Sequence, residues 1–420
     1  MTKSKYLNRW LWKWHIIAGL ITVPVMILLS ITGIIYLFKA DYEDAIYNEV
    51  KVVEQQGERL SYEQLLVSAQ VASDKKISKL VLPKTETEAI QFVSGQRAQT
   101  RTIYVNPYTG TITGEIVAAN TLMMTIRKLH GELLLGKGGT LFVELVASWF
   151  VVLIITGLYV WWPAKDFKLR GFFTIRTKNG RRLFYRDLHA VLGFWLSLFM
   201  LIILAGAMPW TDVFGSQLKW VQKQTDTGYP TTWRNSRGLQ SDISSTAHSL
   251  SIDEMVAVAI LQNLEGQTTL TLPPKTINVF TVSNKSRLLR DQYVRHFDQY
   301  SGELVRAHDW GDVGILMDAR QVAMRLHQGE YGSLSWWTVL IVSLLFTISS
   351  AAGLISYLIR KPVGRWGIPE VPEKWQLSSA LVGIVLGLGV LFPMFGGSLV
   401  LLFLLDITKN RVSKKLIRAI

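Results

Sequence analysis

The sequence predicts a mainly α-helical integral membrane protein built from two tandem copies of one unit: a helix, a small α+β domain and a second helix. Three observations support this fold class: four apolar runs of membrane length, two polar segments with matching motifs, and basic residues beside the ends of the runs. An apolar run of about 18 or more residues is long enough to cross a bilayer as a helix. We therefore expect the four runs to form a four-helix bundle, followed by a C-terminal membrane segment.

The four runs cover residues 16–38, 141–162, 190–210 and 335–359. The first run follows a basic stretch and in this respect resembles a signal peptide. It is longer than the apolar region of a signal peptide and has no small-residue cleavage pattern, so we expect a retained anchor.

A fifth apolar run is interrupted by Pro393 and by Gly396-Gly397. A single crossing would leave the basic tail outside, against the charge rule for membrane proteins. A broken hairpin, bent between Pro393 and Gly397, would return the tail to the inside, although each arm is then short for a full crossing. The charge rule favours the bent form.

The formal net charge of +14 is concentrated beside the membrane helices. Basic residues near helix ends mark the cytoplasmic side, so we expect the N-terminus inside and two long segments outside. The charge follows the membrane surface rather than one soluble face, which argues against a nucleic-acid partner. The absence of cysteine excludes disulfides, iron–sulfur clusters and thiolate-bound metals.

These boundaries divide the chain into ten expected segments. In the first half they are an anchor with membrane helix one (1–38), an outer α+β domain (39–128), membrane helix two (129–163) and a basic cytoplasmic loop (164–187). In the second half they are membrane helix three (188–210), an outer α+β domain (211–325), membrane helix four (326–360), a cytoplasmic linker (361–378), the C-terminal membrane segment (379–406) and a basic tail (407–420).

The two outer segments share a series of motifs. Each opens a helix with a serine cap followed by acidic residues, at Ser61 and at Ser251. Each continues through strand-like runs to a hairpin whose turn ends in glycine, at Gly110 and at Gly302. We infer a tandem duplication whose copies enter the membrane in the same direction, as parallel repeats.

Four histidines lie at corresponding positions of the two copies. His15 and His189 lie at the inner ends of membrane helices one and three, and His130 and His327 lie just outside helices two and four. In a bundle the duplication brings His15 opposite His189 and His130 opposite His327. A histidine at a helix end is often only interfacial, so the symmetry of the two pairs carries the metal-ligand hypothesis.

Paired imidazoles from facing helices suit some metal centres better than others. Two histidines make a poor zinc site, which needs three or four protein ligands, but they fit the two axial positions of a haem iron. Gly19 and Gly193, one helical turn after a histidine, would leave room for a macrocycle. Without a C-x-x-C-H motif, each haem would be non-covalent and b-type, giving two haem b per chain.

The remaining polar residues give weaker signals. We expect His248, His296 and His308 in a loop, a strand and a loop, solvated or locally hydrogen-bonded. Glu144, an acid within a membrane helix, is expected to extend to the interface or to pair locally. No nucleotide or flavin motif is present, so electrons would come from a quinol or another protein.

The ordered motifs resemble those of the PepSY-associated transmembrane family. They are Trp14-His15-x3-Gly19 with Thr32-Gly33, Leu129-His130-Gly-Glu, Leu188-His189-x3-Gly193 and Leu326-His327, and the outer segments look like PepSY domains. The family includes iron-regulated inner-membrane proteins of Gram-negative bacteria and di-haem ferric-siderophore reductases. The resemblance implies that His15, His130, His189 and His327 are haem ligands. The chain departs from the family pattern at Leu204-Ala-Gly206, where Thr-Gly is usual.

The sequence thus favours a bacterial inner-membrane di-haem b reductase with both PepSY-like domains in the periplasm. Its substrate would be a ferric siderophore or another ferric chelate. Two other hypotheses remain. A permease for siderophores or peptides would need polar residues at mid-membrane depth, and few are present. A cofactor-free regulatory anchor would bind envelope proteins through its outer domains.

Overall fold

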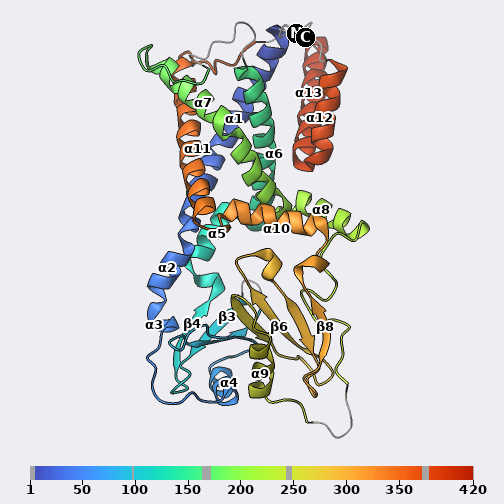
Figure 1. Cartoon of the computed structure of the whole chain (residues 1–420). Coiled ribbons are helices and arrows are strands. Elements are labelled where there is room, and N and C mark those ends of the chain that lie inside the picture. The colour runs from blue at the N-terminus through green and yellow to red at the C-terminus, as the bar shows by residue number, and fades with distance from the viewer. Residues whose placement is uncertain (1–4, 97–98, 163–171, 243–247, 371–377, 420) are drawn as a thin grey trace. The chain divides into compact units, whose positions relative to one another are not determined.

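A computed structural model describes residues 5–96, 99–162, 172–242, 248–370 and 378–419 of the chain (Figure 1). The chain divides into two compact units. The membrane unit comprises Met1–Leu37, Arg127–Trp220 and Ala323–Ile420, and the sheet unit comprises Phe38–Ile126 and Val221–Val322.

Four helices in the described part of the chain are long and apolar enough to cross a membrane. They are α1 (Lys5–Leu37), α6 (Gly136–Trp161), α7 (Arg181–Ala207) and α11 (Ser333–Arg360). Helix α1 packs on α6 and α11, and α7 packs on α6 and α11. The run 335–359 lies within α11, and the other three runs extend one to three residues past the ends of α1, α6 and α7.

The centre of the membrane unit is filled by large apolar side chains. Met26, Val146 and Leu196 are buried there, and Phe150 meets Phe346 edge to face with ring centroids 5.1 Å apart. Many apolar side chains on the opposite faces of the same helices are exposed. A wide exposed apolar surface suits contact with lipid rather than with water.

Helix α7 begins earlier than the sequence predicts, at Arg181 rather than at Leu188. Gly180 precedes it with φ 87°, and the buried Asp187 carboxylate accepts from Arg176 Nε at 2.6 Å and from Arg186 Nη2 at 2.7 Å. These ion pairs stabilise the first turns of α7. The predicted loop 164–187 is therefore partly helical; its first residues, like 371–377 of the predicted linker, lie outside the described residues.

Shorter helices flank the long ones. Helices α5 (Leu122–Glu132) and α10 (Ile315–Gln328) precede α6 and α11, and α8 (Val213–Gln224) follows α7 after the 3₁₀ turn η3 (Met208–Trp210). Glu144 of α6 is fully buried and accepts the backbone N–H groups of Val213 and Phe214, both at 2.8 Å. Of the two alternatives expected for Glu144, it does not extend to the interface but is paired, because its carboxylate caps the start of α8.

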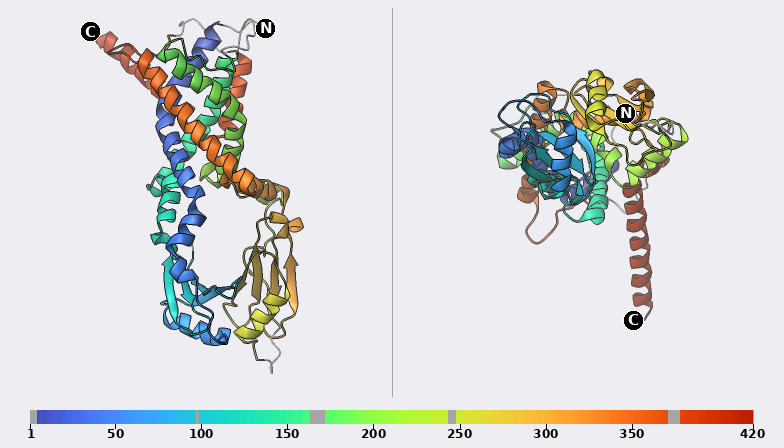
Figure 2. Two further views of the ribbon diagram at one scale, coloured as in Figure 1. Left: turned by 60° about the vertical axis from the view of Figure 1, so that its left-hand side comes forward. Right: turned by 90° about the horizontal axis from the view of Figure 1, so that it is seen from below.

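The C-terminal segment consists of two helices, α12 (Ser379–Leu391) and α13 (Pro393–Ala419). They separate at Phe392, and Gly389 contacts the backbone of Gly396 across the bend. Trp149 of α6 donates to Ser398 Oγ at 3.1 Å, which fixes the start of α13 against the bundle. Beyond this contact α13 extends away from the other helices of its unit (Figure 2).

The sheet unit contains one antiparallel sheet with the strand order β4-β3-β2-β1-β5-β6-β7-β8. Its strands are β1 (Ile77–Val81), β2 (Ile90–Ser94), β3 (Arg101–Val105), β4 (Ile112–Val117), β5 (Gln267–Thr271), β6 (Phe280–Lys285), β7 (Val294–Phe297) and β8 (Leu304–His308). Its helices are α2 (Lys39–Ile46), α3 (Asn48–Lys51), α4 (Tyr62–Val71) and α9 (Ile252–Leu261), with 3₁₀ turns η2 (Ala118–Asn120), η4 (Leu289–Asp291) and η5 (Trp310–Asp312).

The strands of the two outer segments join in one continuous sheet. Strand β1 pairs with β5, with Leu80 opposite Leu270 at the centre of the sheet. Both residues are buried, and α4 and α9 contribute to the same core. The sequence did not predict this pairing because each segment already contained a complete four-stranded motif.

Helices α4 and α9 also bond to each other at their first turns. Asp253 of α9 accepts the backbone N–H groups of Tyr62 and Glu63 at 2.7 and 3.2 Å, and Glu63 accepts that of Ile252 at 3.4 Å. Carboxylates stabilise helix N-termini by bonding free N–H groups and by complementing the helix dipole. Each helix therefore helps to cap the other.

Local turn and capping signals predicted the ends of these elements well. Capping boxes form at Ser61 and at Ser251, and the β3–β4 and β7–β8 hairpins turn through Gly110 and Gly302. Both glycines have positive φ, 71° and 72°, which explains the residue choice. These predictions are confirmed.

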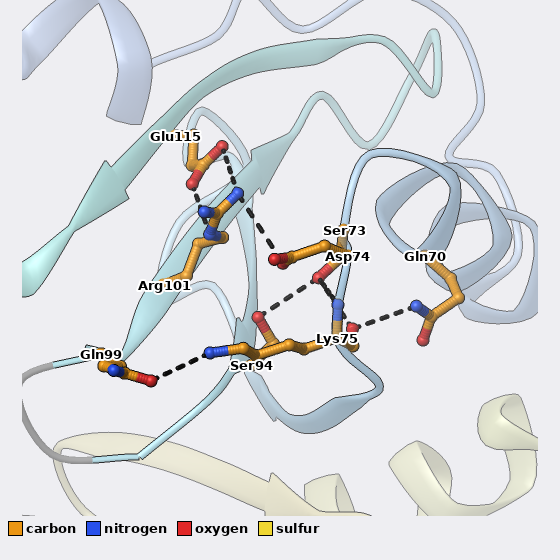
Figure 3. Close-up of polar contacts among 8 residues, drawn as sticks. All are labelled: Gln70, Ser73, Asp74, Lys75, Ser94, Gln99, Arg101 and Glu115. Carbon is orange, nitrogen blue, oxygen red and sulfur yellow. Dashed lines mark hydrogen bonds and ion pairs between the residues drawn. The ribbon is translucent and has the colours of Figure 1, made fainter.

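A polar cluster ties the loop after α4 to the first half of the sheet (Figure 3). Arg101 of β3 pairs with Glu115 of β4 at 2.8 Å and lies 3.9 Å from Asp74. Ser73 donates to Ser94 of β2 at 3.2 Å. Most of these charges are partly exposed, so the cluster orients the loop more than it stabilises the fold.

Candidate functional site

The four predicted histidines meet in two pairs within the membrane unit. His15 of α1 lies opposite His189 of α7, with ring centroids 6.3 Å apart. His130 near the end of α5 lies opposite His327 near the end of α10, with centroids 6.1 Å apart. These are the expected partners, and their role as metal ligands stays a prediction.

Thr156 fixes the ring of His15 and determines which nitrogen carries the proton. Its Oγ1 lies 3.0 Å from His15 Nδ1. The same hydroxyl donates to the carbonyls of Val152 and Leu153 in the preceding turn of α6, at 2.8 and 3.2 Å. A hydroxyl has a single proton, and carbonyls can only accept. Since that proton is shared with the helix carbonyls, Nδ1–H donates to Oγ1, and the neutral ring keeps its lone pair on Nε2.

Thr32 of α1 holds His130 in the same way. Its Oγ1 lies 3.1 Å from His130 Nδ1 and donates to the carbonyls of Leu28 and Leu29, at 2.8 and 3.0 Å. The proton of His130 is therefore also on Nδ1. The two first-copy histidines share one arrangement, in which a helix threonine relays the ring N–H to the helix backbone.

The second-copy histidines bond directly to backbone carbonyls. His189 Nδ1 lies 3.0 Å from the carbonyl of Ser349 in α11, and His327 Nδ1 lies 2.9 Å from that of Ile203 in α7. A carbonyl only accepts, so both rings carry their proton on Nδ1. Among the described residues none hydrogen-bonds Nε2 of any of the four rings, so with the proton on Nδ1 each ring has an Nε2 lone pair that could bind a metal.

A glycine of a neighbouring helix lies against each of the four histidines. A methyl group at Gly157 would come 3.1 Å from His15 Cε1, and one at Gly353 would come 2.8 Å from His189 Nδ1. A methyl group at Gly33 would come 3.3 Å from His130 Cε1, and one at Gly206 would come 2.6 Å from His327 Cβ. A side chain at Gly206 or Gly353 would force a shift of the histidine or its helix, and one at Gly33 or Gly157 would make a tight contact.

The residue before each glycine explains the departure at Leu204-Ala-Gly206. Threonine precedes Gly33 and Gly157, and there its hydroxyl accepts from the ring. Alanine precedes Gly206 and Gly353, and there the ring bonds to a carbonyl one turn earlier. Loss of the threonine changes the acceptor but keeps the tautomer.

A cavity of about 470 Å³ adjoins the pair His15 and His189. Its walls come from α1, α6, α7 and α11 and are largely apolar, and its volume is within the range of small-molecule and cofactor sites. Gly19 and Gly193 line it, and a methyl group at either would meet no atom within 4 Å. Their missing side chains therefore leave open space beside the histidines.

These features can be compared with the needs of different metal centres. Within the described residues, no three His, Cys, Asp or Glu side chains are grouped so that they could hold a metal ion, which leaves two imidazoles per pair. Two imidazoles that share a metal at about 2 Å from each ring nitrogen have centroids about 6 Å apart. Both pairs match this spacing, and the apolar cavity adjoins the pair His15 and His189.

Sequence reasoning missed several residues of the site. Thr156, Gly157, Ser349 and Gly353 were not singled out as partners of the histidines. A usable signal was present, because Thr-Gly occurs both at Thr32 and at Thr156, each time in a helix that faces a histidine of another helix.

The other histidines belong to the sheet unit. His248 lies in a loop and His296 in β7, as predicted, whereas His308 is the last residue of β8 rather than part of a loop. His296 is fully buried between Thr281 Oγ1 at 2.8 Å and the carbonyl of Thr232 at 2.9 Å. Burial lowers the pKa of His296, and nearby positive groups lower it further.

Comparison with known proteins gives one match. A family model described as the PepSY-associated TM region covers residues 12–360. A comparison with curated proteins gave no match.

Proposed function

Because the chain belongs to the PepSY-associated transmembrane family, we propose that it is an inner-membrane di-haem b reductase. It would pass electrons from the cytoplasmic side of the membrane to ferric iron in the periplasm. The substrate would be a ferric siderophore or a related ferric chelate, and the product ferrous iron released for uptake.

One observation carries this proposal: two facing histidine pairs in which every ring donates its Nδ1 proton to a neighbouring helix. Metal-binding histidines commonly donate their second nitrogen in this way, which fixes the ring and keeps the other nitrogen basic. An interfacial histidine has no need of a glycine-lined approach and a fixed tautomer. Four such rings in two pairs support the proposal that His15 with His189 would hold one haem, and His130 with His327 the other.

The chain's own residues would orient and enclose the bound groups. Haem b, when bound, supplies an iron that changes by one electron between ferric and ferrous states. Thr156 and the Ser349 carbonyl hold the rings of one pair, and Thr32 and the Ile203 carbonyl hold those of the other. The largely apolar walls of the cavity would limit the access of water to the first pair.

The proposed orientation follows from charge. Basic residues beside α1, before α7 and in the C-terminal tail favour a cytoplasmic location for those ends. The sheet unit is then periplasmic, with its two halves arising from one duplicated PepSY-like segment. Matching capping boxes and hairpins in the two halves support that origin.

Electron supply and delivery are assigned by chemical class. A membrane quinol or a donor protein would give up electrons near His15 and His189. Reduction of one ferric ion to ferrous iron takes one electron, so a two-electron quinol would serve two ferric ions and release two protons.

The test is a reduced-minus-oxidised absorption spectrum of the purified full-length protein, together with its haem content. We expect a low-spin b-type spectrum with two haems per chain. His15→Ala should remove one haem and leave the other, and His130→Ala should do the reverse.

A correctly folded preparation that stays colourless after incubation with excess haem and removal of the unbound haem would refute the proposal. Loss of both haems from either single change would contradict two separate pairs. Uptake of a ferric siderophore into vesicles without any reductant would favour the permease instead.

A further inference from the structure

Three arginines lie along the His15–His189 cavity. Arg182 is in the first turn of α7, Arg186 lies one turn later, and Arg360 is the last residue of α11. The rest of the lining is mostly apolar. Guanidinium groups gathered beside an apolar cavity favour an anionic part of a ligand at that position.

One of the three arginines is already paired with a carboxylate. Asp187 accepts from Arg186 Nη2 at 2.7 Å and Nε at 3.1 Å, and also from Arg176 Nε at 2.6 Å. This buried carboxylate therefore serves two guanidinium groups. Arg186 is held in place and is not the best candidate for binding an external anion.

Arg182 and Arg360 have no such partner. Neither forms an ion pair with a carboxylate of the described chain, and their two positive charges repel each other. The guanidinium of Arg360 lies 4.8 Å from the ring centroid of Trp12, a cation–π contact that holds it beside the cavity. Two unneutralised charges at one cavity match a ligand with two negative groups.

We propose that Arg182 and Arg360 bind the two carboxylate groups of a flat, apolar ligand in this cavity, namely the two propionates of haem b. The inference rests on the proposed function and adds which edge of the cofactor faces the helix ends. Haem b has an apolar macrocycle and two propionates on one edge. The cavity offers apolar walls, two imidazoles and two guanidinium groups that no carboxylate of the described residues pairs with.

The alternative hypothesis is that these arginines bind lipid phosphate, as basic residues at membrane edges commonly do. The two hypotheses differ in how removal of the arginines changes the affinity for haem. Propionate binding requires that the effect depend on free carboxylates of the ligand. Lipid binding predicts no such dependence.

The experiment compares haemin with its dimethyl ester, in which both carboxylates are blocked. The full-length chain carries His130→Ala and His327→Ala, so that only one site remains, and is prepared without haem. Arg182→Gln, Arg360→Gln and the double variant are titrated with each ligand and followed by absorption. The matched control is Arg365→Gln, an exposed arginine that does not line the cavity.

We expect each cavity substitution to weaken haemin binding about tenfold and the pair about a hundredfold, since a charge-assisted bond contributes about 1.5 kcal/mol or more. The dimethyl ester should bind the unsubstituted chain more weakly, with an affinity that the substitutions leave unchanged. The control should bind haemin like the unsubstituted chain. In chains that keep His130 and His327, the other haem should remain, which shows that the variants fold.

Unchanged haemin affinity in both single variants and the double variant would overturn the inference in favour of lipid phosphate. An equal loss for haemin and for its ester would overturn it as well, because carboxylates would then play no part. If the chain that keeps Arg182 and Arg360 binds neither haemin nor its ester, the proposed function itself fails. Failure of the proposed function can therefore be told apart from failure of the arginine assignment.

Discussion

Replacement of Thr156 by valine tests the role assigned to the ring tautomer. Valine keeps the shape of threonine but has no oxygen, so the His15 Nδ1–H that now donates at 3.0 Å loses its acceptor. The glycine contact and the helix packing stay the same. Only the hydrogen bond changes.

The size of the effect follows from the surroundings of the ring. A buried donor without a partner costs about 1–3 kcal/mol, which is about 5- to 150-fold in an equilibrium constant. His15 also lies near the carbonyl of Leu153, which already accepts from the Thr156 hydroxyl at 3.2 Å. The ring can turn to that carbonyl, as His189 does to Ser349, so we expect the lower part of the range, about tenfold.

The assay is the rate at which purified protein loses haem to an excess of a haem-scavenging globin. Thr156→Val should speed the loss of one haem about tenfold and leave the other unchanged, whereas Thr32→Val should affect only the second. Thr156→Ser keeps the hydroxyl and is the matched control. Equal losses from Thr156→Val and Thr156→Ser would refute the hydrogen-bond argument, because the shape of the side chain would then be the cause.

Three further predictions follow from the contacts described above. Gly353→Ala places a methyl group 2.8 Å from His189 Nδ1 and should empty one haem site. The control Gly383→Ala, whose methyl group would meet no atom within 4 Å, should empty none. A Gly353→Ala protein that keeps both haems would contradict the argument that the helices must approach closely at this glycine. Glu144→Gln keeps one acceptor oxygen for two N–H groups and should lower the free energy of unfolding by about 1–3 kcal/mol. This loss would be measured as a lower melting temperature. An unchanged melting temperature would show that the protein does not need the cap at α8. Burial lowers the pKa of His296, so as the pH falls the unfolded chain becomes protonated at this residue at a higher pH than the folded chain. The stability of the sheet unit should therefore fall as the pH drops below about 6.5, by at most about 1.4 kcal/mol per pH unit. Thermal unfolding at several pH values measures this slope, which should flatten in His296→Gln; the same slope in both proteins would assign it to another group.

Patterns within one helix or one turn were readable from the sequence. The apolar runs, the caps at Ser61 and Ser251 and the glycine turns at Gly110 and Gly302 each depend on residues close together in the chain. Such signals are local, and backbone geometry alone limits their outcome. The histidine pairing was also predictable, because the repeat supplied each ring with an equivalent.

Interactions between distant segments were not readable in the same way. Glu144 caps a helix about seventy residues away, and nothing in its own surroundings indicates that partner. The acceptors of His189 and His327 are backbone carbonyls, which any residue type provides, so no side-chain pattern marks Ser349 or Ile203. These contacts are determined by how the helices pack in the folded chain.

The pairing of β1 with β5 has a consequence for how the chain is made. Strand β1 is an inner strand only when residues 269–271 are present, since Lys79, Leu80 and Val81 pair with them. Until α7 and α8 have been synthesised and β5 follows, the first four strands end in an open apolar edge, a surface prone to recruit other strands. A chain that stopped after the first repeat would carry that edge permanently. By pairing β5 with β1, the second repeat therefore protects the first repeat against aggregation.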